Sequence, residues 1–329
     1  DARAEGGAGM IESLPLLAWP PFRQALTILI FHRVLPAPDP LRPGEPSAAE
    51  FDRFMGFIAD HFSVLPLREA VERLKQNRLP KRACCITFDD GYADNLTVAL
   101  PILEKHRLPA TVFIATGYLD GGRMFNDAVI DAIAKTGHER LDLAGIGLGE
   151  HAIGGVAARR VAIATILEQL KYRPPGQRHE DVAHLLERAD CGPLPTDIML
   201  TGAQVQELSR RGVAIGGHTV NHAILASIED DMAREEIAAG KQRLESITGK
   251  PVPTFAYPNG RPHKDYSARH AAMVRELGFE LAVSTAHGVG KPGSDVFQLP
   301  RFTPWGATNL KRSAQMLRNA WTGKAATSC

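Results

Sequence analysis

The 329-residue chain lacks an excess of charge of either sign, because 38 lysines and arginines are matched by 37 aspartates and glutamates, for a formal net charge of +1. A protein that binds nucleic acid usually carries a basic stripe or a clear surplus of positive charge. The sequence shows neither, so we expect no nucleic-acid partner. Its 44% of hydrophobic and 23% of charged residues are typical of a globular protein with a large core.

Cysteine is scarce in this chain. The four cysteines form no Cys-x-x-Cys pair, which excludes a thiolate zinc site or a disulfide framework of the usual spacing. Cys84 and Cys85 stand inside an apolar run, where we expect them to be small buried side chains.

Apolar runs long enough to cross a membrane as a helix are also missing. The run ALTILIF is followed directly by His32 and Arg33, well short of the roughly 20 residues that a bilayer requires. The opening DARAEGGAGM lacks the charged and then apolar order of a signal peptide. We therefore expect no integral membrane segment and a cytoplasmic location, with the periplasm or secretion as the alternative if a signal sequence has been removed.

Short β-prone runs alternate with amphipathic helical stretches. Strands are predicted at 26–34, 83–88, 110–116, 213–219, 253–258, 280–285 and 297–302. Helices are predicted at 48–62 and at 228–248, the second with Ser227 as N-cap and Gly249 as terminator. This alternation predicts an α/β fold, with a parallel sheet that is covered by helices and is either open or closed into a barrel.

The segment from about 120 to 200 interrupts this alternation. It contains no convincing strand, but 127–137, 159–171 and 179–189 show helical periodicity and are separated by glycine and proline. We interpret it as a helical insertion and not as an independent domain. Because it follows one strand and precedes another, we expect it to lie over or beside the face where the strands end, and to limit which substrates enter.

Two motifs place chemically capable side chains after predicted strands, where α/β folds gather their ligands. ITFDDGYADN ends a strand with Asp89 and Asp90, although ordinary Asp-Gly turn chemistry would also explain this pair. Neighbouring residues at a strand end point in opposite directions and can take different tasks. In GGHTVNH, His218 and His222 are four residues apart, and on a helical turn that spacing puts both imidazoles within reach of one metal ion.

Together these residues supply what a hydrolytic metal site needs, since two histidines and one carboxylate leave open positions on a divalent ion. One aspartate can bind the metal while the other acts on a water whose pKa the metal lowers to about 7. The motif FAYPNG, at 255–260, also ends a strand. On its own a tight turn is the simpler interpretation, but a backbone N–H in that turn can serve as an oxyanion donor.

TFDDG, HTVNH and FAYPNG, in this order on a β/α chain, resemble the motifs of the polysaccharide deacetylases, carbohydrate esterase family 4 with the NodB homology domain. The resemblance spans about 26–302, and LIFHRV is similar to the exopolysaccharide-associated branch. It implies a distorted (β/α) barrel of about seven strands with a helical insertion. The domains are then an N-terminal extension at 1–23, the barrel domain at 24–311 and a C-terminal tail at 312–329.

The resemblance also implies an activity and assigns residues to it. The activity is metal-dependent removal of N-acetyl groups from an N-acetylhexosamine-containing polysaccharide or glycan precursor. Matched by motif position, Asp89 is the catalytic base and the backbone N–H of Asn259 is the oxyanion donor. Tyr92 and Tyr257 are predicted to bind substrate. The ligands of zinc, or of another divalent metal, are Asp90, His218 and His222.

The acid side of the family pattern is altered. Ala256 stands near the place of the arginine that orients the base, no Asp-Trp pair occurs near AVSTAHGVG, and LPRF offers Arg301 where the family has a histidine acid. We expect His32 to be the acid, although a strand-end histidine bonded to the backbone is an equal alternative. Arg301 is expected to pair with Asp89 and orient it, because guanidinium releases no proton in this pH range.

Two other functions stay open at this stage. The altered acid-side motifs suggest a non-catalytic carbohydrate-binding barrel, and the insertion would also suit the lid of a small-molecule amidohydrolase. Retention of both aspartates and both histidines favours the deacetylase, since a binding module has no need for Asp89 beside a metal ligand. The expected partner is an acetylated glycan, and the oligomeric state stays open.

Overall fold

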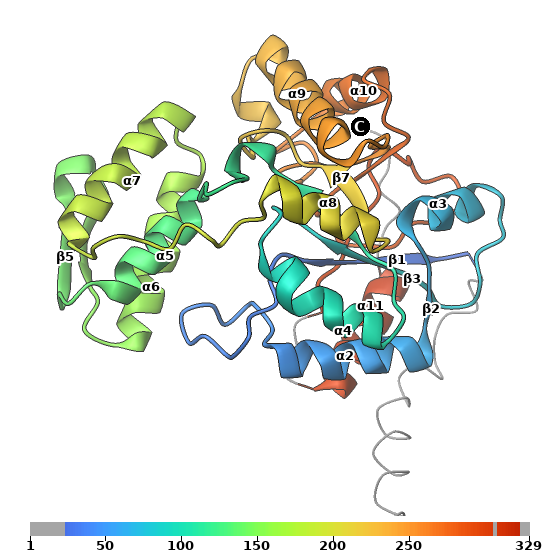
Figure 1. Cartoon of the computed structure of the whole chain (residues 1–329), viewed down its shortest axis with the longest axis horizontal. Coiled ribbons are helices and arrows are strands. Elements are labelled where there is room, and N and C mark those ends of the chain that lie inside the picture. Colours follow the sequence, from blue (N-terminus) through green and yellow to red (C-terminus); the bar gives the residue numbers. More distant parts are fainter. Residues whose placement is uncertain (1–23, 305–307, 323–329) are drawn as a thin grey trace, which may run out of the picture.

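The computed structural model describes residues 24–304 and 308–322. Its centre is a parallel sheet in the order β1-β3-β4-β7-β8-β9, with β2 beside β3. The strands are β1 Leu26–Phe31, β2 Ser63–Val64, β3 Ala83–Phe88, β4 Thr111–Ile114, β7 Ala214–Gly217, β8 Thr254–Ala256 and β9 Leu281–Val283. The sheet curves into a half-barrel surrounded by helices (Figure 1). This arrangement confirms the predicted distorted (β/α) barrel.

Strands β1 and β3 are neighbours at one end of the sheet order and are both part of the core. Both are buried along their whole length, as expected for the near-continuous apolar runs LTILIF and ACCITF in a parallel sheet covered on both faces. They pair in register, with Phe31 opposite Phe88 at their carboxyl ends. The N–H of Asp89 then donates to the carbonyl of Phe31 at 2.9 Å. This register brings His32 and the two aspartates to the same end of the sheet.

The predicted strand at 297–302 is not a regular strand. It makes isolated bridges, Leu299 with Val283 of β9 and Phe302 with Leu29 of β1. Pro300 lies between these bridges and has no N–H to donate, which explains why no continuous ladder forms. The segment still connects the two edge strands of the sheet. Strand β2, which has two residues, was not predicted from the sequence.

Helices cover the sheet: α2 Ala48–His61, α3 Leu67–Lys75, α4 Leu100–Lys105, α8 Gly202–Arg210, α9 Asp230–Thr248, α10 Ala268–Glu276 and α11 Asn309–Thr322. Gly249 ends α9 with a left-handed φ of 66°, as predicted. The predicted N-cap, Ser227, is wrong because its hydroxyl donates to the carbonyl of Ile224, and Glu229 takes that position. None of the described helices is both long and apolar enough to cross a bilayer.

The predicted domain boundaries can be compared with the structure only at the C-terminal end. Helix α11 runs through the predicted boundary at 311, and its Met316 is buried in the main core. The predicted N-terminal extension at 1–23 lies outside the described residues. Short helical turns complete the barrel and the insertion: η1 Asn95–Ala99, η2 Thr116–Tyr118, η3 Ala144–Ile146 and η4 Leu225–Ser227.

The insertion forms a lobe beside the barrel (Figure 1). It consists of α5 Phe125–Lys135, β5 Arg140–Leu143, β6 Gly149–Ala152, α6 Val156–Lys171 and α7 Pro175–Ala189. Val129, Ile166 and Leu185 belong to its own hydrophobic core. The expectation of a purely helical segment was wrong, because β5 and β6 pair as an antiparallel sheet. Each of these strands has four residues and includes charged side chains, so neither gives a clear strand pattern.

Helix α9 supports the loop that carries the HTVNH motif. Gly240 faces this loop so closely that an added Cβ would lie 2.9 Å from the carbonyl oxygen of Thr219. Glu236, one turn earlier, accepts hydrogen bonds from the N–H groups of Val220 and Asn221 at 3.0 and 2.8 Å. The helix therefore fixes the loop through a close backbone approach and a carboxylate.

Replacing Gly240 should show how tightly this contact is packed. We expect Gly240→Ala to lower the free energy of unfolding by about 1–3 kcal/mol, because the new methyl group overpacks the contact with Thr219. The matched control is Gly176→Ala in α7, where no atom lies within 4 Å of the added Cβ. It should leave stability unchanged or raise it by about 0.4–1 kcal/mol. Urea unfolding of both variants checks the contact, and equal effects would contradict it.

Candidate active site

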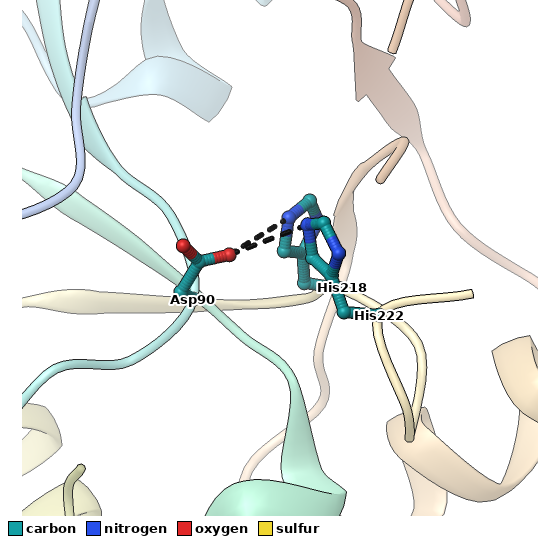
Figure 2. A group of neighbouring side chains, drawn as sticks. All are labelled: Asp90, His218 and His222. Atoms are coloured by element: carbon teal, nitrogen blue, oxygen red, sulfur yellow. Dashed lines mark ion pairs between the residues drawn. The ribbon is translucent and has the colours of Figure 1, made fainter. Parts of the chain in front are cut away.

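Asp90, His218 and His222 gather at the carboxyl ends of β3 and β7. Their ligand atoms lie within 4.8 Å of one another. Oδ1 of Asp90 is 3.5 Å from Nε2 of His218 and 3.4 Å from Nε2 of His222 (Figure 2). This buried oxygen has no hydrogen-bond partner. A buried carboxylate oxygen that faces two imidazole nitrogens and makes no hydrogen bond fits a divalent cation held among the three residues.

The two histidines reach this position by different means. His218 directly follows β7, and its Nδ1 lies 2.7 Å from the carbonyl oxygen of Ala256, which leaves Nε2 directed at Asp90. The loop to His222 is not the helical turn that the sequence suggested. Thr219 and His222 instead adopt left-handed φ values of 64° and 51°. A non-helical loop therefore brings the two imidazoles close together, as the predicted helical turn would have done.

Both charge and burial favour the metal-binding forms of these side chains. Burial alone would raise the pKa of Asp90, but the adjacent imidazoles of His218 and His222 hold that pKa below its ordinary value. Burial lowers the pKa of His222 to about 4, against the opposing influence of Asp90. At neutral pH Asp90 is a carboxylate and His222 is a neutral imidazole, the forms that bind a metal.

Asp89 forms a buried two-pronged ion pair with Arg301. The two guanidinium nitrogens donate to its carboxylate oxygens at 2.6 and 2.7 Å. Arg301 also donates from Nε to the carbonyl of Ser284 at 3.1 Å. Burial would raise the pKa of Asp89, but the positive charge of Arg301 outweighs it and holds that pKa below its ordinary value. The structure thus places Arg301 where it can keep Asp89 ionised and oriented.

His32 and Asn259 line the same cavity as the two aspartates, a space of about 980 Å³. Burial lowers the pKa of His32, but the charges of Asp90 and Glu45 raise it overall. Asn259 has a left-handed φ of 57°, and its carbonyl accepts the hydroxyl of Thr285. The structure therefore brings every residue predicted for the chemistry to one cavity, while their roles stay predictions.

The predicted substrate-binding tyrosines do not line this cavity. Tyr257 is buried, stacks on Tyr266 with ring centroids 3.8 Å apart, and donates its hydroxyl to the carbonyl of Phe297. Tyr92 is also buried, and its hydroxyl donates to Asp127 at 2.8 Å. The prediction that these tyrosines bind substrate is therefore corrected, because both side chains are buried in the core and lie outside the cavity lining.

Sequence reasoning missed most of the cavity wall. Phe125 and Tyr172 come from the insertion, which therefore lies beside the strand ends as expected. The missed basic residues are Lys171, Arg178, Arg261 and Lys264. In the sequence they look like the solvated face of a helix or loop, and only tertiary packing brings Lys171 and Arg178 of the insertion to the same cavity as Arg261 and Lys264 of the barrel.

A family model described as polysaccharide deacetylase matches residues 76–144 and 178–282, together more than half of the chain. The chain therefore belongs to the polysaccharide deacetylase family. That family is a class of metalloenzymes, in agreement with the Asp-His-His cluster. The stretch that the family model leaves out, 145–177, lies within the insertion and includes β6 and α6.

Two curated relatives match parts of the chain. YxkH of Bacillus subtilis (strain 168), a polysaccharide deacetylase candidate by name, is 22% identical over 254 residues, which cover 77% of this chain and 63% of YxkH. The poly-beta-1,6-N-acetyl-D-glucosamine N-deacetylase of Staphylococcus aureus (strain MSSA476) is 33% identical over 90 residues, 27% of this chain and 30% of that enzyme. The chain thus spans less than two thirds of the length of either relative.

Solved structures share the fold. The Streptococcus pyogenes deacetylase PplD, in complex with acetate, superposes with a TM-score of 0.59 at 20% identity, over 89% of this chain and 98% of that chain. IcaB from Ammonifex degensii gives a TM-score of 0.57 at 18% identity, over 90% of this chain and 98% of its own.

The Asp89–Arg301 pair should make a large and pH-dependent contribution to the stability of the metal-free protein. The pKa of Asp89 in the folded protein lies below its ordinary value. At a pH above the ordinary value the pair therefore stabilises the fold fully, and this stabilisation is lost as the pH falls through the pKa of the folded state. Arg301→Gln leaves a buried carboxylate unpaired. We expect it to lower the free energy of unfolding at pH 7 by about 3–5 kcal/mol. The difference in unfolding free energy between this variant and the unsubstituted protein should become smaller at acid pH, because a protonated Asp89 no longer needs a charged partner.

The control for this variant is Arg68→Gln. Arg68 makes a similar two-pronged pair with Glu280, at 2.5 and 2.7 Å, but both side chains are exposed. Its loss should cost at most about 1 kcal/mol. Urea unfolding between pH 4 and pH 7 compares the two, and equal losses would contradict the stabilising role of the buried pair.

Proposed function

We propose that this protein is a metal-dependent hydrolase that removes N-acetyl groups from an N-acetylhexosamine-containing polysaccharide or glycan precursor. One observation carries the proposal: a cluster suited to a metal, Asp90 with His218 and His222, shares a cavity with Asp89, which Arg301 keeps ionised. The Staphylococcus relative, an N-deacetylase of an N-acetylglucosamine polymer by name, supports this choice of substrate. A carbohydrate-binding barrel would have no use for the ionised Asp89.

Zinc suits the ligand set best, because two imidazole nitrogens and one carboxylate oxygen with an open position are typical of catalytic zinc sites. When bound, the metal would supply a Lewis acid that polarises the acetyl carbonyl and lowers the pKa of a water molecule. Family membership and the cluster of Asp90, His218 and His222 support a divalent ion in general.

The chain's own residues then divide the remaining work. Asp89 accepts a proton from the attacking water, whose oxygen adds to the acetyl carbon. The backbone N–H of Asn259 donates to the carbonyl oxygen as negative charge develops on it. His32 donates a proton to the nitrogen as the carbon–nitrogen bond breaks, and acetate and the free amine leave. The cavity of about 980 Å³ has room for more than one sugar, since ligand pockets are roughly 300–1,000 Å³.

Two substitutions should separate metal binding from proton transfer. Asp89→Asn keeps the shape of the side chain but cannot accept a proton, so we expect a full equivalent of metal and a turnover about 10²–10⁴-fold lower. Asp90→Ala removes a ligand and should lose most of the metal on dialysis. Metal analysis and acetate release from N-acetylglucosamine oligomers measure the two properties. If Asp90→Ala kept its metal, or Asp89→Asn its activity, the residue roles would be wrong.

His32 should set the alkaline limb of the pH–rate profile. As the acid, it must be protonated, so the rate should fall as the pH rises through its pKa. His32→Gln should retain metal, lower turnover about 10²-fold and abolish this limb. His287→Gln, which changes another histidine of the same cavity, should keep the limb. An unchanged profile in His32→Gln would place the acid elsewhere.

A further inference from the structure

One wall of the cavity carries four positive charges that the proposed deacetylation does not use. We call these residues the basic wall: Lys171 and Arg178 of the insertion, and Arg261 and Lys264 of the loop that follows β8. Within the described part of the chain, none of the four has a carboxylate at ion-pair distance. Lys171 and Arg178 are half-buried, and the other two are exposed.

Negative charge on the cavity lining does not balance this wall. Asp89 is already paired with Arg301, and Asp90 belongs to the metal cluster. Glu168 is the remaining acidic residue on the described lining. Since the whole chain has a net charge of +1, the surplus is local to the cavity and does not reflect a basic protein.

Aromatic rings and one buried carboxylate hold the basic wall in place. Nζ of Lys264 lies 4.5 Å from the ring centre of Tyr172, and the guanidinium of Arg178 lies 4.6 Å from that of Phe125. The hydroxyl of Tyr172 donates to Asp265 at 3.3 Å, which connects the insertion to the loop after β8. Arg178 and Lys264 are therefore held by contacts with aromatic faces and not by exposed acids.

The positive charges around Lys171, which also lower its pKa, agree with a site for an anion. Burial lowers its pKa, Asp265 opposes this change, and the positive charges of Arg261 and Lys264 lower the pKa further. Like charges gathered at a partly desolvated surface repel one another, and an anionic group placed among them is attracted by all of them.

One of the four residues of the basic wall, Lys171, lies in the stretch 145–177 that the family model does not match. Arg178, Arg261 and Lys264 lie in its second matched stretch, 178–282. The metal cluster and Asp89 belong to the matched parts.

We propose that the basic wall binds an anionic group of the substrate, so that the glycan deacetylated by this protein is acidic. A carboxylate, as in a uronic acid, or a phosphate lies near the reacting N-acetylhexosamine. One cavity contains both the wall and the metal cluster, so one glycan can contact both. The inference rests on the proposed function for the identity of the reacting sugar, but the charge preference is measurable without turnover.

Binding of matched charged and neutral probes tests the proposal. The first pair is a hyaluronan hexasaccharide, with alternating N-acetylglucosamine and glucuronic acid, and its carboxyl methyl ester. The second pair is chitohexaose with and without a terminal phosphate. By calorimetry on the zinc-loaded protein we expect at least one charged probe to bind about 10-fold more tightly than its neutral partner. The preference should weaken with added salt.

Paired lysine variants assign the preference to the wall. Lys171→Gln with Lys264→Gln should bring the charged-to-neutral affinity ratio close to one. The matched control, Lys75→Gln with Lys81→Gln, removes the same charge outside the cavity lining and should keep the ratio. A preference within the first pair alone identifies a carboxylate, and within the second pair alone a phosphate. Equal binding in both pairs, or a ratio that survives in the wall variant, overturns the proposal.

Acetate release from the same probes distinguishes this inference from the proposed function. If no probe releases acetate but the charge preference depends on Lys171 and Lys264, the basic wall stands and the deacetylase activity fails. If acetate is released without any charge preference, the activity stands and the acidic substrate is refuted.

Discussion

The buried pair between Asp89 and Arg301 is the interaction on which the active-site region depends. It joins residues 212 positions apart, with donor–acceptor distances of 2.6 and 2.7 Å. A buried ion pair stabilises a fold only when its remaining hydrogen-bonding groups are satisfied, and here Ser284 accepts a further guanidinium N–H. Because Arg301 lies on the segment that bridges β9 and β1, the same pair anchors this connection and orients Asp89, the proposed general base.

The backbone is strained at the residues of the three motifs. Asp90, Thr219, His222 and Asn259 all have left-handed φ values, between 51° and 73°. Each costs of order 1 kcal/mol, which the surrounding structure must offset. Hydrogen bonds from the loop of His222 to helix α9 are one such support. These supports hold Asp90, His218 and His222 together in the arrangement that we propose for metal binding.

The insertion and the barrel supply different parts of the site. The barrel strands position the metal cluster and the base, whereas the insertion contributes much of the cavity wall. Asp127, at the start of α5, accepts the hydroxyl of Tyr92 and contacts Arg33, the residue after His32. Tyr92 therefore connects the lobe to the barrel, a structural role in place of the substrate contact that the sequence suggested.

Local patterns in the sequence determined most strands of the parallel sheet, the main helices and the residues that we propose as metal ligands, because apolar periodicity shows which face is buried and a short motif places its residues near one another. The pairing of Arg301 with Asp89 was predicted from the sequence, but its burial and two-pronged geometry were settled by tertiary structure, as were the burial of Tyr257 and the makeup of the basic wall. Arg301 reaches Asp89 because the segment after β9 returns to β1. Contacts between distant segments depend on the packing of the whole chain, so local patterns of residues do not fix their geometry.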